Sequence, residues 1–253
     1  MELEIEIVNS HLFCENQLRR CKKARLLCLR AWANLVKMVL EDCDMEHGLK
    51  TGFVLQAFQT ILPKLELFSS DDIDAAEVFS SLGQSLISHL TFDAATFGTG
   101  RGSDLANDRL YQLFRTSLKC IQSSTATAKL REDLYNVALR YLNGMAAVRG
   151  QAIDTRRHIT QTVKGSGDKL LEVICNDAYA GEGACKIVAL LLLESLAAVA
   201  AEENSPYVLE ALVRQNFLVV LVDSIKSITT DLQSARHEGS YFPLRSRITL
   251  TYS

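Results

Sequence analysis

The feature that most constrains the fold is a tandem pair of apolar helical segments between residues 182 and 228. The first, residues 187–201, is apolar at nearly every position, and Glu194 lies at its middle. The second begins after AlaGluGluAsnSerPro and continues to about Ile228. A helix that is hydrophobic nearly all round must be covered on several sides. We therefore expect residues 187–201 to form a helix sandwiched between other helices.

This apolar segment does not predict a membrane-spanning helix. Residues 187–201 are shorter than the ~20 residues that a bilayer requires, and the segment carries Glu194. The chain opens with the acidic sequence MetGluLeuGluIleGluIle, which does not resemble a signal peptide. Seven cysteines, an odd number, then indicate a reducing compartment. We expect no membrane insertion.

Composition favours an all-α fold. Hydrophobic residues make up 48% of the 253 residues, whereas three prolines and 13 glycines are too few for the frequent turns of an all-β chain. The formal net charge of -3 argues against direct binding of nucleic acid, because such domains are usually strongly basic. Caps and apolar stripes predict nine helices, at residues 17–41, 50–67, 70–92, 103–121, 130–148, 156–164, 168–178, 187–201 and 206–228.

The order and spacing of these helices predict an irregular α-solenoid. Antiparallel helix pairs recur every ~40 to 50 residues, which is the period of HEAT and armadillo arrays. A closed helical bundle is the alternative, and it differs by lacking extended concave and convex surfaces. We assign residues 17–228 to one solenoid segment of about eight or nine helices, with a flexible glycine-rich loop near 93–103. Residues 1–16 form a poorly defined N-terminal segment, and residues 229–253 a poorly ordered tail.

The first predicted helix carries two patterns that could bind a ligand. Cys14, Cys21 and Cys28 recur every seven residues, but a rise of about 10.5 Å separates neighbours, which is too far for one metal ion. A helical wheel instead places the last two cysteines on a core face with Trp32, Leu35 and Val39. The opposite face is basic, and it is either a solvated surface or a candidate interaction face for acidic protein or nucleic acid, formed by Arg19, Lys22, Lys23, Arg30 and Lys37.

Motifs for catalysis or cofactor binding do not emerge from the sequence. The glycine clusters at 164–169 and 180–186 lack the ending of a phosphate-binding loop, and the five histidines are scattered. Asp71, Asp72 and Asp74 fall at a predicted helix N-terminus, where acidic side chains are favourable without a metal. We therefore predict no catalytic, cofactor-binding or metal-binding residues, no cofactor and no small-molecule substrate.

The last helical hairpin is the second candidate contact surface. It is apolar, and nothing polar caps it before the pattern dissolves after Asp231, so the array is expected to be a fragment of a longer one. Its unpartnered residues would make the isolated chain self-associate, and the residues expected at this apolar contact end are Leu212, Phe217 and Val220.

Residues 114–142 read PheArgThrSerLeuLysCysIleGlnSerSerThrAlaThrAlaLysLeuArgGluAspLeuTyrAsnValAlaLeuArgTyrLeu, and the apolar hairpin follows them. Together these segments resemble the large inner-ring scaffold nucleoporins of the nuclear pore complex, in a fungal form. The resemblance is clearest over 105–228 and extends to 24–92. It implies a non-enzymatic, karyopherin-like α-solenoid at the nuclear envelope that grips segments of linker nucleoporins and supports nucleocytoplasmic transport. Family members are several times longer than this chain, and the final 20 or so residues depart from the family's helical pattern. The alternative is a soluble transport receptor or a cytosolic helical-repeat adaptor.

Overall fold

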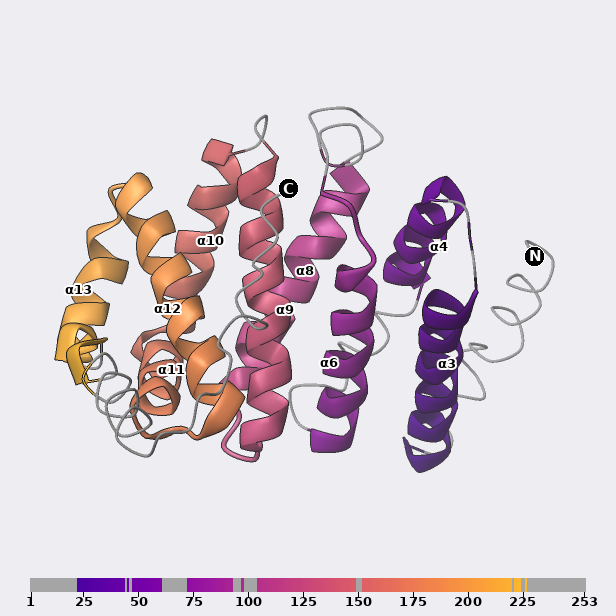
Figure 1. Cartoon of the computed structure of the whole chain (residues 1–253), viewed down its shortest axis with the longest axis horizontal. Helices are drawn as coiled ribbons and strands as arrows, with labels where there is room; N and C mark the ends of the chain where they lie inside the picture. The colour runs from indigo at the N-terminus through magenta and orange to yellow at the C-terminus, as the bar shows by residue number, and fades with distance from the viewer. Residues whose placement is uncertain are drawn as a thin grey trace, which may run out of the picture.

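The structure, a computed structural model, consists of helices stacked in a row (Figure 1). It describes residues 22–43, 45, 47–60, 72–92, 97, 104–148, 152–219, 221–223 and 226. Within these residues the chain forms nine helices: α3 (Lys22–Asp42), α4 (His47–Thr60), α6 (Ile73–Ser88), α8 (Asp104–Ile121), α9 (Ala128–Ala147), α10 (Ala152–Ser166), α11 (Asp168–Ala180), α12 (Gly183–Glu202) and α13 (Pro206–Arg214). The predicted all-α solenoid is confirmed.

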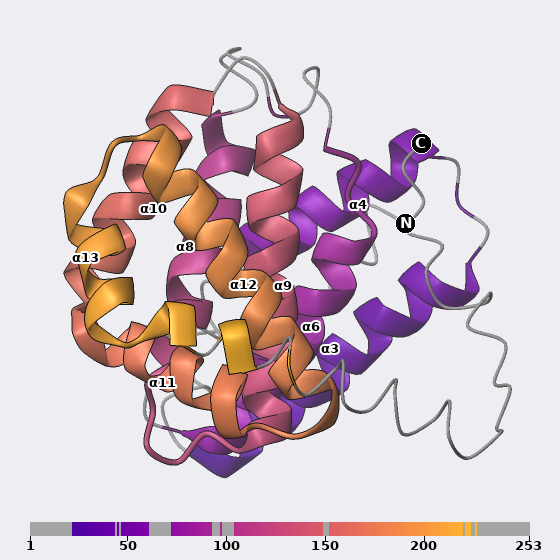
Figure 2. The same ribbon diagram turned by 60° about the vertical axis from the view of Figure 1, so that its left-hand side comes forward.

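The helices form two layers. In one layer α3, α6, α9 and α12 pack side by side in that order. The other layer contains α4, α8, α10, α11 and α13, and α8 and α11 pack against α9 and α12 across the interior. Figure 2 shows α3 and α4 at the opposite end of the stack from α13. Each layer thus presents a long outer surface on which several helices lie side by side.

The apolar stripes predicted for two helices of the first layer form the centre of the core. Every member of both stripes is buried: Ala75, Phe79, Leu82, Leu86 and Leu90 on and just after α6, and Leu130, Leu134, Val137, Tyr141, Met145 and Val148 on and just after α9. Asp72 caps α6 by accepting a hydrogen bond from the Asp74 backbone N–H at 3.1 Å, as the sequence predicts. Gly167, at a φ of 70°, separates α10 from α11.

The apolar helix α12 lies within the stack. It contacts α9, α10, α11 and α13, so several helices pack against it as predicted, but only six of its 20 residues are buried: Cys185, Ala189, Leu192, Leu193, Leu196 and Ala200. By length and composition it is also the one helix among the described residues that could cross a bilayer. Ile187 and Leu191 nevertheless remain 60% and 43% exposed, so one stripe of this helix is open.

A buried ion pair joins the two layers near the start of α9. Arg131 donates from Nε to Oδ2 of Asp177 at 2.6 Å and from Nη2 to Oδ1 at 2.9 Å. Tyr135 donates its hydroxyl to the same carboxylate at 2.7 Å, and the Cys185 thiol lies 3.8 Å away. Burial, together with the neighbouring carboxylate, raises the pKa of Cys185 to about 11. Asp177 on α11 is therefore a shared acceptor for side chains of α9 and α12.

The structure differs from the predicted pattern at both ends of the stack. Cys28 and Leu35 are exposed, because α3 turns a different face, with Leu29, Val36 and Leu40, toward α6. The predicted last helix is interrupted after Arg214 by a turn with Asn216 at a φ of 56°, and residues 217–219 and 221–223 beyond the turn are helical again. The N-terminal segment 1–16, the C-terminal tail 229–253 and most of the loop at 93–103 lie outside the described residues and stay predictions.

Candidate functional site

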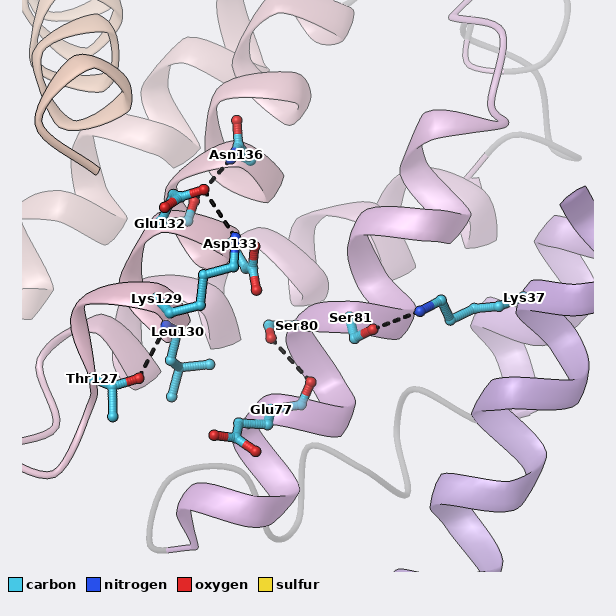
Figure 3. Close-up of polar contacts among 10 residues, drawn as sticks. All are labelled: Lys37, Glu77, Ser80, Ser81, Thr127, Lys129, Leu130, Glu132, Asp133 and Asn136. Carbon is cyan, nitrogen blue, oxygen red and sulfur yellow. Dashed lines mark hydrogen bonds and ion pairs between the residues drawn. The ribbon is translucent and has the colours of Figure 1, made fainter. Parts of the chain in front are cut away.

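A groove on the outer side of the first layer is the candidate functional site. It encloses about 390 Å³ between α3, α6 and the beginning of α9. Figure 3 shows the side chains that α6 and α9 place along it, with Lys37 of α3 beside it. The residues that line it are Arg30, Ala33, Asn34, Glu77, Val78, Ser80, Ser81, Thr127, Lys129, Leu130 and Asp133.

Local helix geometry places the polar groups of the groove. Thr127 ends the preceding turn and caps α9, because its hydroxyl accepts a hydrogen bond from the Leu130 backbone N–H at 3.2 Å (Figure 3). On α6, Ser80 donates to the Glu77 carbonyl oxygen at 3.1 Å. Lys37 reaches from α3 and donates to the Ser81 hydroxyl at 2.9 Å. The groove is therefore bordered by three helices, two of which, α3 and α6, are joined by the Lys37–Ser81 hydrogen bond.

The cations of the groove lie beside carboxylates. Lys129 is 2.9 Å from Glu132 and 3.1 Å from Asp133, and its hydrogen bonds to these two carboxylates, Glu132 first, raise the pKa of its ammonium group. Arg30 lies 3.8 Å from Asp74 across the α3–α6 contact. Because the carboxylates offset both cations, the groove lacks the excess positive charge that a phosphate or nucleic-acid site requires.

The groove offers polar groups that suit non-covalent binding of a protein segment. Hydroxyl, amide and charged groups can donate to or accept from the backbone and side chains of a bound segment. Over the described ranges, no group of three or more histidine, cysteine, aspartate or glutamate residues is arranged to hold a metal ion. The Asp72 side chain caps α6 by accepting from the Asp74 backbone N–H, and Asp71 lies outside the described residues.

The structure brings two residues of the predicted basic face to this groove. Arg30 lines it, and Lys37 is half-buried beside it. Lys22 and Lys23 belong to α3, but their side chains, like the whole of Arg19, lie outside what the structure describes. Sequence reasoning missed Asn34, Ser81 and three polar groove residues at the start of α9, namely Thr127, Lys129 and Asp133, since these are ordinary polar residues until the helices are placed next to one another.

The predicted apolar contact end is arranged differently from the expectation. Leu212 and Phe217 are 3% and 9% exposed, and both belong to the core of this end. Val220 lies outside the described residues. Apolar side chains are nonetheless exposed here, and they are those of Val213, Leu218, Val219 and Val222. Leu212 is buried because it shares the inner face of α13 with Val208 and Ala211, and after the break at Asn216 the residues no longer continue the faces of α13.

Comparisons with known proteins place this chain among nuclear pore components. A family model described as nuclear pore complex scaffold, nucleoporins 186/192/205, matches residues 1–249. Nucleoporin NUP192 of Chaetomium thermophilum is 34% identical over 263 residues, which cover 91% of this chain and 15% of that protein. Nucleoporin nup186 of Schizosaccharomyces pombe is 21% identical over 228 residues, covering 83% of this chain and 14% of the relative. The chain thus spans about one seventh of the length of these relatives.

Proposed function

This chain belongs to the family of nuclear pore complex scaffold nucleoporins 186/192/205, and we propose that it is a structural, non-enzymatic segment of the pore's inner ring at the nuclear envelope. The observation that carries this proposal is the family match over residues 1–249 of a chain that folds as stacked helices. A solenoid suits a scaffold, because its repeated helices present extended surfaces on which several partners can be held at fixed positions.

The groove between α3, α6 and α9 is proposed as a place where the scaffold holds a segment of a linker nucleoporin. Its volume of about 390 Å³ accommodates a few side chains. Asn34 and Ser81 offer hydrogen-bonding groups along it, while Val78 and Leu130 contribute apolar surface. Because the charges of the groove are balanced, a segment with polar and small apolar residues fits it better than a strongly acidic one.

Affinity isolation tests both parts of this proposal. The full-length protein, tagged in cells, is recovered from a nuclear-envelope extract beside a variant with Asn34→Trp, which fills the groove from the exposed side of α3. Gln161→Trp on the exposed surface of α10 is the matched control. Wild type and control should recover inner-ring and linker nucleoporins, and the groove variant should lose one linker nucleoporin.

The scaffold proposal and the groove proposal fail by different outcomes. If the wild-type protein recovers none of these nucleoporins, the scaffold proposal is wrong. If the wild type recovers them and Asn34→Trp recovers the same set in the same amounts, the groove is not the place where they bind. A transient transport receptor or repeat adaptor would instead recover a changing set of cargo proteins or a small GTPase.

A further inference from the structure

The first layer exposes one face of each helix, and α12 differs from its neighbours there. The exposed residues of α6 are polar, namely Asp74, Glu77 and Ser88. On α9 the exposed residues are the polar Lys129, Arg140 and Asn143 and the small Ala128, Ala146 and Ala147. On α12 the exposed residues between 187 and 198 are apolar apart from Glu194, and they are Ile187, Leu191 and Ala198. Neither α6 nor α9 exposes a large apolar residue, whereas α12 does; α3, at the far end of the stack (Figure 2), also exposes Leu27, Leu35 and Met38.

These apolar residues form one line along the helix. Ile187, Leu191 and Ala198 are separated by four and seven residues, so they share a face and span about 16 Å at 1.5 Å per residue. Exposed apolar surface of this extent, bordered by polar residues, is typical of an interaction site. We call these three residues the α12 stripe.

The α12 stripe ends in a hollow of about 360 Å³ between α9, α10 and α12. Ala198 belongs to both the stripe and the hollow, so the two are continuous. The apolar residues that line the hollow are Leu142, Met145, Ala146, Ile159, Ala198 and Val199. A single large apolar side chain of a partner, such as leucine or phenylalanine, could fill part of this space.

Acidic groups border the stripe and the hollow. Arg156 donates to Glu202 at 2.9 Å and to Glu203 at 3.2 Å, so two carboxylates face one guanidinium group. The Glu202 side chain is 60% exposed and keeps oxygen atoms open to solvent. Glu194 is exposed within the line of the stripe and makes no ion pair with any described residue. The stripe and the hollow carry the carboxylates of Glu194 and Glu202. The charge of their cation, Arg156, is also offset by Glu203, so the surface is negative overall and complements a basic ligand.

We propose that the α12 stripe and the adjoining hollow bind an amphipathic helical segment of a partner protein. The partner places apolar side chains, spaced three or four residues apart, on Ile187 and Leu191 and in the hollow, and a lysine or arginine next to Glu202. The straight line of contacts over three helical turns suits a helix laid along α12. This surface is separate from the groove beside α3 and does not depend on the function proposed for that groove.

Site-specific photocrosslinking identifies the occupant. A photoreactive benzoylphenylalanine replaces Leu191 in the full-length protein in cells, and the crosslinked peptide is sequenced by mass spectrometry. In the control, benzoylphenylalanine replaces Ser88 on α6 instead. The proposal expects a segment of another protein at position 191 alone, with apolar residues at helical spacing and a lysine or arginine within one turn. Crosslinks to this chain's own residues, to an acidic segment, or to no protein would overturn it.

The captured segment, made as a peptide, then allows a quantitative test on the same protein. Leu191→Asp and Glu202→Lys should each weaken its binding at least about tenfold, as expected for central contacts. Leu35→Asp on α3 is the matched control, because Leu35 is 44% exposed and Leu191 is 43% exposed. This variant should leave the affinity for the peptide unchanged. Should Leu191→Asp fail to fold, Ile187→Gln takes its place.

Equal binding by the wild type and these folded variants would contradict the proposal. A lipid surface is the other apolar ligand to exclude. If the wild type binds phosphatidylcholine vesicles and Leu191→Asp does not, the stripe contacts lipid and the proposal is likewise overturned.

Discussion

Replacing Asp177 tests the interior of the stack most strongly, because its carboxylate accepts hydrogen bonds from two side chains of α9. In Asp177→Ala the guanidinium of Arg131, whose side chain is 21% exposed, loses its bidentate partner. Breaking a buried ion pair by removing one partner costs roughly 3–5 kcal/mol. The Tyr135 hydroxyl also loses its acceptor, but Arg131 is not fully buried, so we expect a total loss of about 4 kcal/mol in the free energy of unfolding.

Urea unfolding followed by circular dichroism at the helical minimum measures this loss. With a denaturant dependence of about 2–3 kcal/mol per molar urea, a loss of about 4 kcal/mol lowers the midpoint by about 1.5 M. Asp133→Ala is the control, because Lys129 opposite it is 70% exposed and such a pair contributes only about 0.3–0.5 kcal/mol. The double variant Arg131→Met with Asp177→Leu removes both charges and should recover part of the loss.

A loss below about 1 kcal/mol in Asp177→Ala would refute the reasoning, since it would mean that water reaches the Arg131 guanidinium readily. If the double variant is less stable than Asp177→Ala, the shape and hydrogen bonds of the pair matter more than its unpaired charge, and the physical account of the cluster is wrong.

Three further predictions concern single elements. Thr127→Ala removes the cap of α9 and should lower the free energy of unfolding by about 1 kcal/mol in urea, whereas no change would mean that water replaces the cap. Gly144→Ala would bring a methyl group into the ring of Phe92, so a loss of about 1–3 kcal/mol is expected in the same assay, and an unchanged midpoint would contradict that contact. Burial raises the pKa of Cys175 and Cys185 to about 11 from 9.0, so the folded chain keeps thiol protons that the unfolded chain loses first. Stability should therefore fall between about pH 9 and 11, and alanine at both positions should reduce that fall; an equal fall in the variant would contradict the assignment.

The interior of the stack could be predicted from the sequence because its helices are amphipathic. On α9 the apolar residues lie on one side only, so their spacing identifies both the helix and its buried face. On α3 the same reasoning was only partly right, because Trp32 is buried and Val39 half-buried, whereas Cys28 and Leu35 are exposed. Leu27, Leu35 and Met38 are exposed there although they are apolar, so apolar residues occur on both sides of the helix and the pattern no longer identifies one face.

Contacts between distant residues could not be predicted in the same way. Arg131 and Asp177 are 46 positions apart, and neither shows a local signal that would pair them. The groove beside α3 depends likewise on three helices meeting. The early end of α13 did have a local signal, since asparagine adopts a positive φ more readily than most residues, and Asn216 has that conformation.

The exposure of the α12 stripe could be predicted from the sequence only in part. The sequence correctly predicted that residues 187–201 would need cover on several sides, because they are apolar nearly all round. It could not predict that four neighbouring helices would still leave Ile187 and Leu191 open. An apolar helix therefore identifies a surface that must be covered, while the structure is needed to find which side of it remains for a partner.

The central claim, that this chain is part of a stable nuclear pore scaffold, is tested most directly by the residence of the full-length protein in cells. The protein is tagged fluorescently at its own chromosomal locus, and a section of the nuclear rim is photobleached. A scaffold component should be confined to the rim and should recover there no faster than new pores assemble. A diffuse signal, or recovery within seconds by exchange with a soluble pool, would contradict the account and favour a transport receptor or adaptor.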